Sequence, residues 1–108
     1  MEIEQARLLV LKTAWMIDNV GAKEARKEIS LIKAVVPTML SNVVDRAMQV
    51  FGAMGLTPDT PLAFLWTWGR AMRFLDGPDE VHLRTVARAE IEKAKENRGS
   101  TAAYYYLR

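Results

Sequence analysis

Apolar residues recur in steps of three and four along most of this 108-residue chain, a spacing typical of helices that bury one face. Glycine and proline interrupt the pattern at Gly21, within residues 52–61 and at Gly77-Pro78, so the spacing predicts four helices. No segment shows the strict alternation of a half-buried strand. The sequence therefore predicts an all-α protein, an up-and-down four-helix bundle.

Capping and breaking residues set approximate limits for these helices. The first is expected from about Ile3 to Val20 and the second from Ala22 to about Phe51. Pro37 lies inside the second helix, where we expect a kink or a break into two pieces. The third helix opens at Asp59-Thr60-Pro61, a cap followed by proline. The fourth opens at Gly77-Pro78-Asp79-Glu80, whose acids suit the positive end of the helix dipole.

One domain is expected over residues 1–97, followed by a tail over residues 98–108 that contains Tyr104-Tyr105-Tyr106. Half of the residues are apolar, which is enough for a core. Large aromatic and sulfur-containing residues fall at helical spacing and are interpreted as core residues in preference to a cofactor site. These residues include Trp15, Met16, Met39, Met48 and Trp66.

Composition excludes several kinds of site. The 15 basic and 13 acidic residues are interspersed, which argues against a nucleic-acid partner. The chain has no cysteine and one histidine, His82, so neither a thiolate nor a multi-histidine metal site is possible. No apolar run approaches the ~20 residues of a membrane span, and no targeting signal opens the chain. We therefore expect a soluble, cytoplasmic protein without a bound metal.

Three features have both a structural and a functional interpretation. Asp76 lies at a helix break, where a carboxylate can point into a cleft, but an acid before Gly-Pro is more often only a helix-boundary residue. Gly52 and Gly55 would allow a close approach to the backbone, although Gly55 as a simple helix stop is favoured. For His82, a surface or hydrogen-bonded histidine is favoured over a metal ligand.

Two collinear patterns resemble the C-terminal segment of the flavin-dependent acyl-CoA dehydrogenases: Gln49-Val50-x-Gly52-x-x-Gly55 followed by Pro61, and Arg70-x-x-Arg73-x-x-Asp76-Gly77-x-x-Glu80-Val81. Upstream, Ala6-Arg7-Leu8-Leu9 and Ile29-Ser30-Leu31-Ile32-Lys33 resemble the two preceding helices of that family. The similarity covers about residues 3–95. The Asp-Gly-Pro-Asp-Glu-Val-His run at 76–82 resembles one subgroup of the family.

The resemblance implies a catalytic role for one residue. The family's base usually precedes the glycine of a Glu-Gly turn, which corresponds here to Asp76. It removes the α-proton of an acyl-CoA thioester while the flavin takes a hydride from the β-carbon. An acid in a dry pocket can be tuned toward the pKa that such a step needs.

The resemblance also implies FAD-binding residues in two groups. Gln49, Gly52 and Ala53 match positions against the adenine dinucleotide of FAD bound by a neighbouring subunit, with Ala53 standing where a second glycine is common. Gly77, Pro78 and Glu80 match the turn and helix start that reach the adenosine and phosphates, where backbone N–H groups suit an anion.

Family enzymes also have an N-terminal helical domain and a middle β domain, and they assemble as dimers or tetramers. Neither domain is present in these 108 residues, so we expect the chain to hold no FAD and to oxidise no acyl-CoA by itself. The alternative function is a non-catalytic helical bundle that uses the same surface for association.

Overall fold

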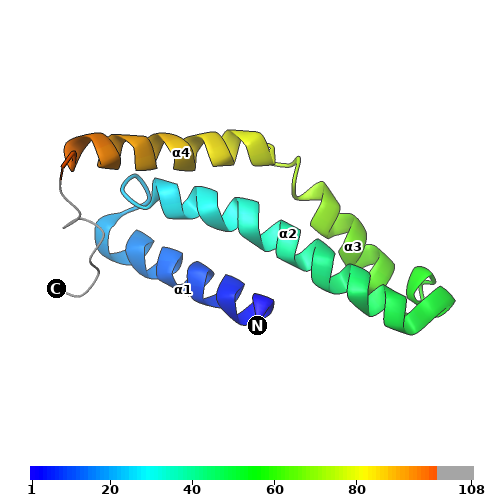
Figure 1. Ribbon diagram of the computed structural model, residues 1–108. Helices are drawn as coiled ribbons and strands as arrows, with labels where there is room; N and C mark the ends of the chain where they lie inside the picture. The colour runs from blue at the N-terminus through cyan, green and yellow to red at the C-terminus, as the bar shows by residue number, and fades with distance from the viewer. Residues whose placement is uncertain (100–108) are drawn as a thin grey trace.

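The computed structural model describes residues 1–99, and all of its regular elements are helical (Figure 1). They are α1 (Glu2–Val20), α2 (Arg26–Phe51), the 3₁₀ helix η1 (Gly52–Leu56), α3 (Leu62–Ala71) and α4 (Asp79–Glu96). No strand occurs within residues 1–99, and the predicted all-α fold with four α-helices is confirmed. Most of the predicted tail, including the tyrosines at 104–106, lies outside the described residues.

The long helix α2 contacts every other element. It packs against α1, η1, α3 and α4, whereas α1 contacts neither α3 nor α4. The chain reverses between α1 and α2 and again at η1, and α3 and α4 then follow one another along α2 (Figure 1). The described bundle is consequently open, with α2 at its centre.

Pro37 does not break α2, which is one helix of 26 residues, so a division into two pieces is excluded. Proline lacks the N–H that would bond to the carbonyl of residue 33. Side-chain hydroxyls bond to carbonyls nearby: Thr38 donates to the carbonyl of Ala34 and Ser41 to that of Pro37, each at 3.0 Å. Pro37 itself is fully buried. Packing on several sides of α2 holds the helix together across the missing bond.

Helix α2 ends before Gly55, the residue that was favoured as its stop. Gly52, with φ of 61°, ends the helix, and Gly55 lies beyond it in η1. Gly55 is buried, and a Cβ there would lie 3.0 Å from the Cα of Met48. The predicted helix stop at Gly55 is therefore wrong, and this glycine instead lets η1 fold back closely on α2.

Both proline-containing helix starts occur where they were predicted. At α3 the helix begins at Leu62 directly after Pro61, and the Thr60 hydroxyl accepts the Leu62 N–H at 3.4 Å, while Asp59 donates its own N–H to Thr57 Oγ1 at 3.3 Å. At α4 the prediction is confirmed, since Asp79 and Glu80 occupy the first turn after Pro78.

No helix within residues 1–99 is both long and apolar enough to cross a membrane.

The core is much smaller than the composition suggested. The buried apolar residues of the described chain are Ala6, Ala25, Val44 and Pro37. The assignment of Trp15 and Trp66 to a core is wrong, because they are 64% and 39% exposed. The methionines at 16, 39 and 48 are half-buried. Because α1 packs on a single neighbour, most of its apolar face has no opposite surface, and the radius of gyration of 17.3 Å exceeds the ~13 Å of a compact chain this long.

We expect Gly69→Val to lower the free energy of unfolding by about 1–3 kcal/mol, because it overpacks the α2–α3 contact. A Cβ at Gly69 would lie 2.9 Å from Ser41 Oγ and 3.3 Å from the backbone N of Ser41. Ala87→Val at an exposed position of α4 is the control, with an expected loss below about 1 kcal/mol. Urea-induced unfolding measures both, and equal effects would contradict the close packing.

The ion pair between Lys27 and Glu90 joins the start of α2 to α4, with Nζ to Oε1 at 2.5 Å. The hydrogen bond and charge of Lys27 lower the pKa of Glu90 below its usual range, with a smaller contribution from Lys93. A lowered carboxylate pKa stabilises the fold above the unfolded pKa, and this contribution is lost as the pH falls through the folded pKa.

Glu90→Gln should therefore reduce the free energy of unfolding by less than about 1 kcal/mol at neutral pH, since the pair is partly solvent-screened. The difference from the parent chain should shrink as the pH is lowered from neutral, and it should vanish once the pH has fallen through the lowered folded pKa of Glu90. Glu92→Gln, at an exposed position of the same helix, serves as the control. Thermal unfolding followed across this pH range checks the prediction, and a difference that persists in acid would refute it.

Candidate functional site

The turn between α3 and α4 contains two successive residues with left-handed backbone. Asp76 has φ of 53° and Gly77 has φ of 98°, and Asp76 is the single non-glycine residue within residues 1–99 with positive φ. Aspartate tolerates this conformation better than most residues. A Cβ at Gly77 would also lie 3.0 Å from His82 Nε2. Backbone conformations of this kind are common at functional sites, which supports the candidate chosen from the sequence.

Asp76 lines a hollow of about 400 Å³ whose walls are mostly apolar. The other lining residues are Val10, Ile29, Ile32, Lys33, Val36, Pro37, Met72 and His82. Within residues 1–99 the Asp76 carboxylate takes part in no hydrogen bond or ion pair. An unpaired carboxylate beside apolar walls is chemically suited to accept a proton.

The two arginines before Asp76 do not contact its carboxylate. Arg70 lies over the ring of Phe74, with its guanidinium carbon 4.2 Å from the ring centre. Arg73 Nε donates to Asp79 Oδ2 at 2.6 Å, and the Asp79 N–H donates to the carbonyl of Arg73 at 3.2 Å. Both arginines therefore act within the turn and its flanks, and leave Asp76 unpaired.

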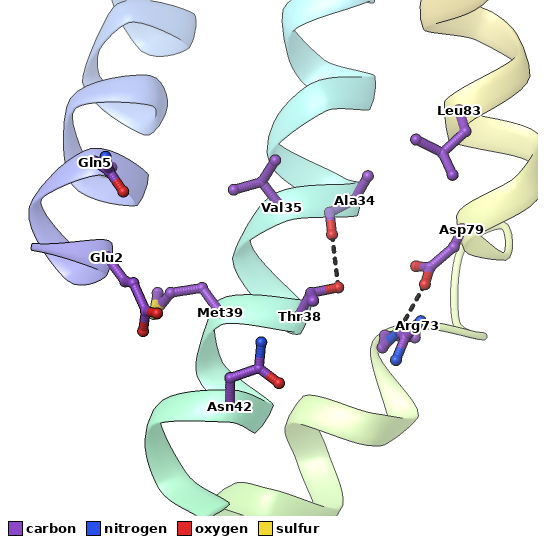
Figure 2. Close-up of a pocket in the computed structure, with 10 residues that line it drawn as sticks. All are labelled: Glu2, Gln5, Ala34, Val35, Thr38, Met39, Asn42, Arg73, Asp79 and Leu83. Carbon is purple, nitrogen blue, oxygen red and sulfur yellow. Dashed lines mark hydrogen bonds and ion pairs between the residues drawn. The ribbon is translucent and has the colours of Figure 1, made fainter. Parts of the chain in front are cut away.

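The Arg73–Asp79 pair borders a second hollow, of about 470 Å³, shown in Figure 2. Its walls include Thr38 and Asn42 of α2, about half a helical turn away from the α2 residues that line the hollow at Asp76. The two hollows thus lie on opposite sides of α2. Asp79 Oδ1 is buried and accepts no hydrogen bond within residues 1–99.

The structure separates the candidate FAD residues into two places. Gln49 and Gly52 line a hollow of about 300 Å³ at the end of α2, with Ala53 exposed beside them. Residues 77–80 lie next to Asp76 at the start of α4. The ten-residue helix α3, about 15 Å long, stands between the two groups. These residues consequently do not form one site within this chain.

Both groups have features that fit a dinucleotide. Nothing lies within 4 Å of a Cβ built on Gly52, so a ligand could approach its backbone closely. At the start of α4, neither Gly77 nor Glu80 donates its backbone N–H to an acceptor within residues 1–99. Two free N–H groups at a helix start suit a phosphate, and Arg73 offsets the charge of the neighbouring Asp79.

Two side chains outside the turn contact it, and the sequence gave reason to expect only one of them to be hydrogen-bonded. Lys33 Nζ donates to the carbonyls of Met72 at 2.5 Å and Gly77 at 3.3 Å, and His82 Nε2 lies 3.1 Å from the carbonyl oxygen of Asp76. His82 is hydrogen-bonded, as its favoured interpretation predicted. Local sequence gives no sign of the Lys33 contacts, because 39 and 44 residues separate the partners.

Comparison with known proteins places the chain in a family. Residues 1–91 match the model described as "Acyl-CoA dehydrogenase, C-terminal domain". The Mycobacterium tuberculosis protein named "Probable acyl-CoA dehydrogenase FadE2" is 60% identical over 94 residues, which are 87% of this chain and 23% of that protein. "Acyl-CoA dehydrogenase family member 10" of Mus musculus is 58% identical over 92 residues, which are 85% of this chain and 9% of that protein.

The fold agrees with that placement. A solved structure from Mycobacterium abscessus, assigned to the acyl-CoA dehydrogenases, matches with a TM-score of 0.84 and 49% identity. The match covers 85% of this chain and 23% of that one. The chain thus spans less than a quarter of the length of these relatives. The helical architecture, the match over residues 1–91 and the similarity to these relatives together show that the chain belongs to the acyl-CoA dehydrogenase family, in the region of its C-terminal domain.

Proposed function

We propose that this chain is the C-terminal domain of an FAD-dependent acyl-CoA dehydrogenase and that Asp76 is its catalytic base. The observation that carries the proposal is the unpaired Asp76 carboxylate, placed on a left-handed turn beside an apolar hollow. Membership of the family supports the reaction class, α,β-dehydrogenation of an acyl-CoA thioester.

Asp76 would take the proton from the α-carbon of the bound thioester onto a carboxylate oxygen. A hydride would leave the β-carbon for FAD, the group that supplies the oxidising chemistry when bound, so that a carbon–carbon double bond would form between the two positions. Apolar walls from α1 and α2 line the hollow, and Asp76 itself is exposed in this chain, so the bound substrate and the remaining domains would have to exclude water from the carboxylate. No hydrogen bond within residues 1–99 has to break before the carboxylate can act.

The two groups of candidate FAD residues support contacts with two FAD molecules or with distant parts of one. Gly77 and Glu80 would contact the cofactor near Asp76 through their free N–H groups, and Pro78, which has no N–H, would contact it from the same turn. Gln49, Gly52 and Ala53 would contact the adenine dinucleotide of FAD held by a neighbouring subunit, because α3 separates them from Asp76. This arrangement favours a homo-oligomer.

The exposed apolar faces suggest what the remainder of such an enzyme would cover. Leu8, Leu11 and Trp15 on α1 are each more than half exposed, as is Val50 near the end of α2. Additional domains or further copies of the chain would bury surfaces of this kind. The alternative of a non-catalytic association bundle would use the same surfaces and leave Asp76 without a role.

The base assignment predicts that Asp76→Asn, made in the full-length protein that carries this chain, lowers the turnover number by at least about 10²-fold. The amide keeps the size of the side chain but cannot take the proton, so FAD content should not change. Asp59→Asn, an exposed position before α3, is the matched control. Acyl-CoA-dependent flavin bleaching provides the measurement, and an Asp76→Asn protein with undiminished activity would exclude the assignment.

The chain expressed by itself should bind FAD with a dissociation constant no tighter than the millimolar range, because the two groups of candidate residues do not converge on one cofactor. Equilibrium dialysis against FAD, read by flavin absorbance, measures this. Stoichiometric yellow FAD retained through purification would show that the chain holds a complete site.

A further inference from the structure

Lys33 connects the N-terminal half of α2 to the turn that carries Asp76. Its ammonium group donates to the carbonyl of Met72, four residues before Asp76, and to the carbonyl of Gly77, the residue after it. Both flanks of the candidate base are therefore attached to one side chain. The same lysine lines the hollow beside Asp76.

The carbonyls that Lys33 contacts have no other partner in the described chain. Because α3 ends at Ala71, the carbonyl of Met72 is one of the orphan acceptors of a helix end. Within residues 1–99 no backbone N–H is donated to Met72 O or Gly77 O. The Lys33 ammonium group thus donates to two carbonyls that the turn between α3 and α4 leaves without a backbone donor.

Other contacts within the turn connect neighbouring parts of it to each other. The Arg73–Asp79 pair joins the two ends of the turn, and His82 reaches back from α4 to the carbonyl of Asp76. Among the described side chains of α2, Lys33 alone donates a hydrogen bond to the turn. It therefore fixes the turn relative to α2, whose residues form much of the hollow at Asp76.

We propose that Lys33 is a positioning residue that holds the Asp76 carboxylate against the hollow by tying both flanks of its turn to α2. The proposal rests on the proposed function, in which Asp76 is the base. Lys33 makes no ion pair with Asp76 within residues 1–99, so it acts through the backbone and leaves the carboxylate unpaired. The positive φ of Asp76 makes this tie important, because the turn could relax to a more common conformation without it.

The test uses the full-length protein with Lys33→Met, which keeps the length of the side chain and removes the donors. Displacing a reacting group by about 1 Å can cost about a hundredfold in rate, so we expect the turnover number to fall about ten- to a hundredfold. KM for acyl-CoA and FAD content should change less than about twofold, a split that general misfolding would not give. Backbone amides of residues 73–77 should exchange hydrogen faster than in the parent protein.

Two further variants make the result specific. Lys33→Arg supplies donors to the same two carbonyls and should restore most of the turnover number. Lys95→Met removes an exposed lysine near the end of α4 and should leave both turnover and amide exchange unchanged. An unchanged turnover number in Lys33→Met would overturn the proposal. It would also be overturned by a parallel loss of FAD, or by an equal effect of Lys95→Met.

Asp76→Asn, assayed alongside, separates this proposal from the function on which it rests. If Asp76→Asn retains activity, the proposed function fails. If Asp76→Asn is inactive while Lys33→Met has normal turnover, the base assignment stands and the positioning role of Lys33 is wrong. The double variant Lys33→Met with Asp76→Asn should be no slower than Asp76→Asn alone, because a misplaced amide loses nothing further.

Discussion

The fold depends on α2, the one helix that contacts all the others. Its 26 residues pass through a buried proline without a break, and its neighbours are arranged along it and do not close around a common core. The hollow at Asp76 exists because the turn after α3 comes back to the middle of this helix. A change that bent α2 near Pro37 would therefore displace the wall of the hollow and the attachment of the turn together.

Much of the secondary structure could be predicted because it is encoded locally. Periodic apolar residues and the breaks at Gly21 and Gly77-Pro78 predicted the four helices to within a few residues. Burial could not be predicted in the same way. Apolar spacing shows which face of a helix is meant to be covered, but not whether the covering surface belongs to the same 108 residues, so Trp15 and Trp66 were expected in a core and lie exposed.

Some residues of the candidate site could likewise be predicted from local sequence, and others could not. Asp76 and Gly77 lie in a short motif at a predicted helix break, where spacing alone favoured Asp76 as a boundary residue and the family resemblance assigned both their roles. The structure shows positive φ at both. Lys33 could not be predicted, since a lysine in a helix has many possible partners and these carbonyls are some 40 residues away. Gly55 was interpreted as a helix stop, whereas the structure shows that it allows close packing against Met48. The sequence does not distinguish these two uses of a glycine.

The separation of the two ends of α3 has a consequence for how such a domain can diverge. Gly55 lets η1 fold back on α2, so the surface at Gln49 and Gly52 is set by contacts that do not involve the turn at Asp76. Substitutions could accumulate at either end with little effect on the other, since the length of α3 and the matching stretch of α2 separate them. The proposed dinucleotide contacts at Gln49 and Gly52 and the proposed proton removal at Asp76 could thus evolve at different rates within a single helical segment.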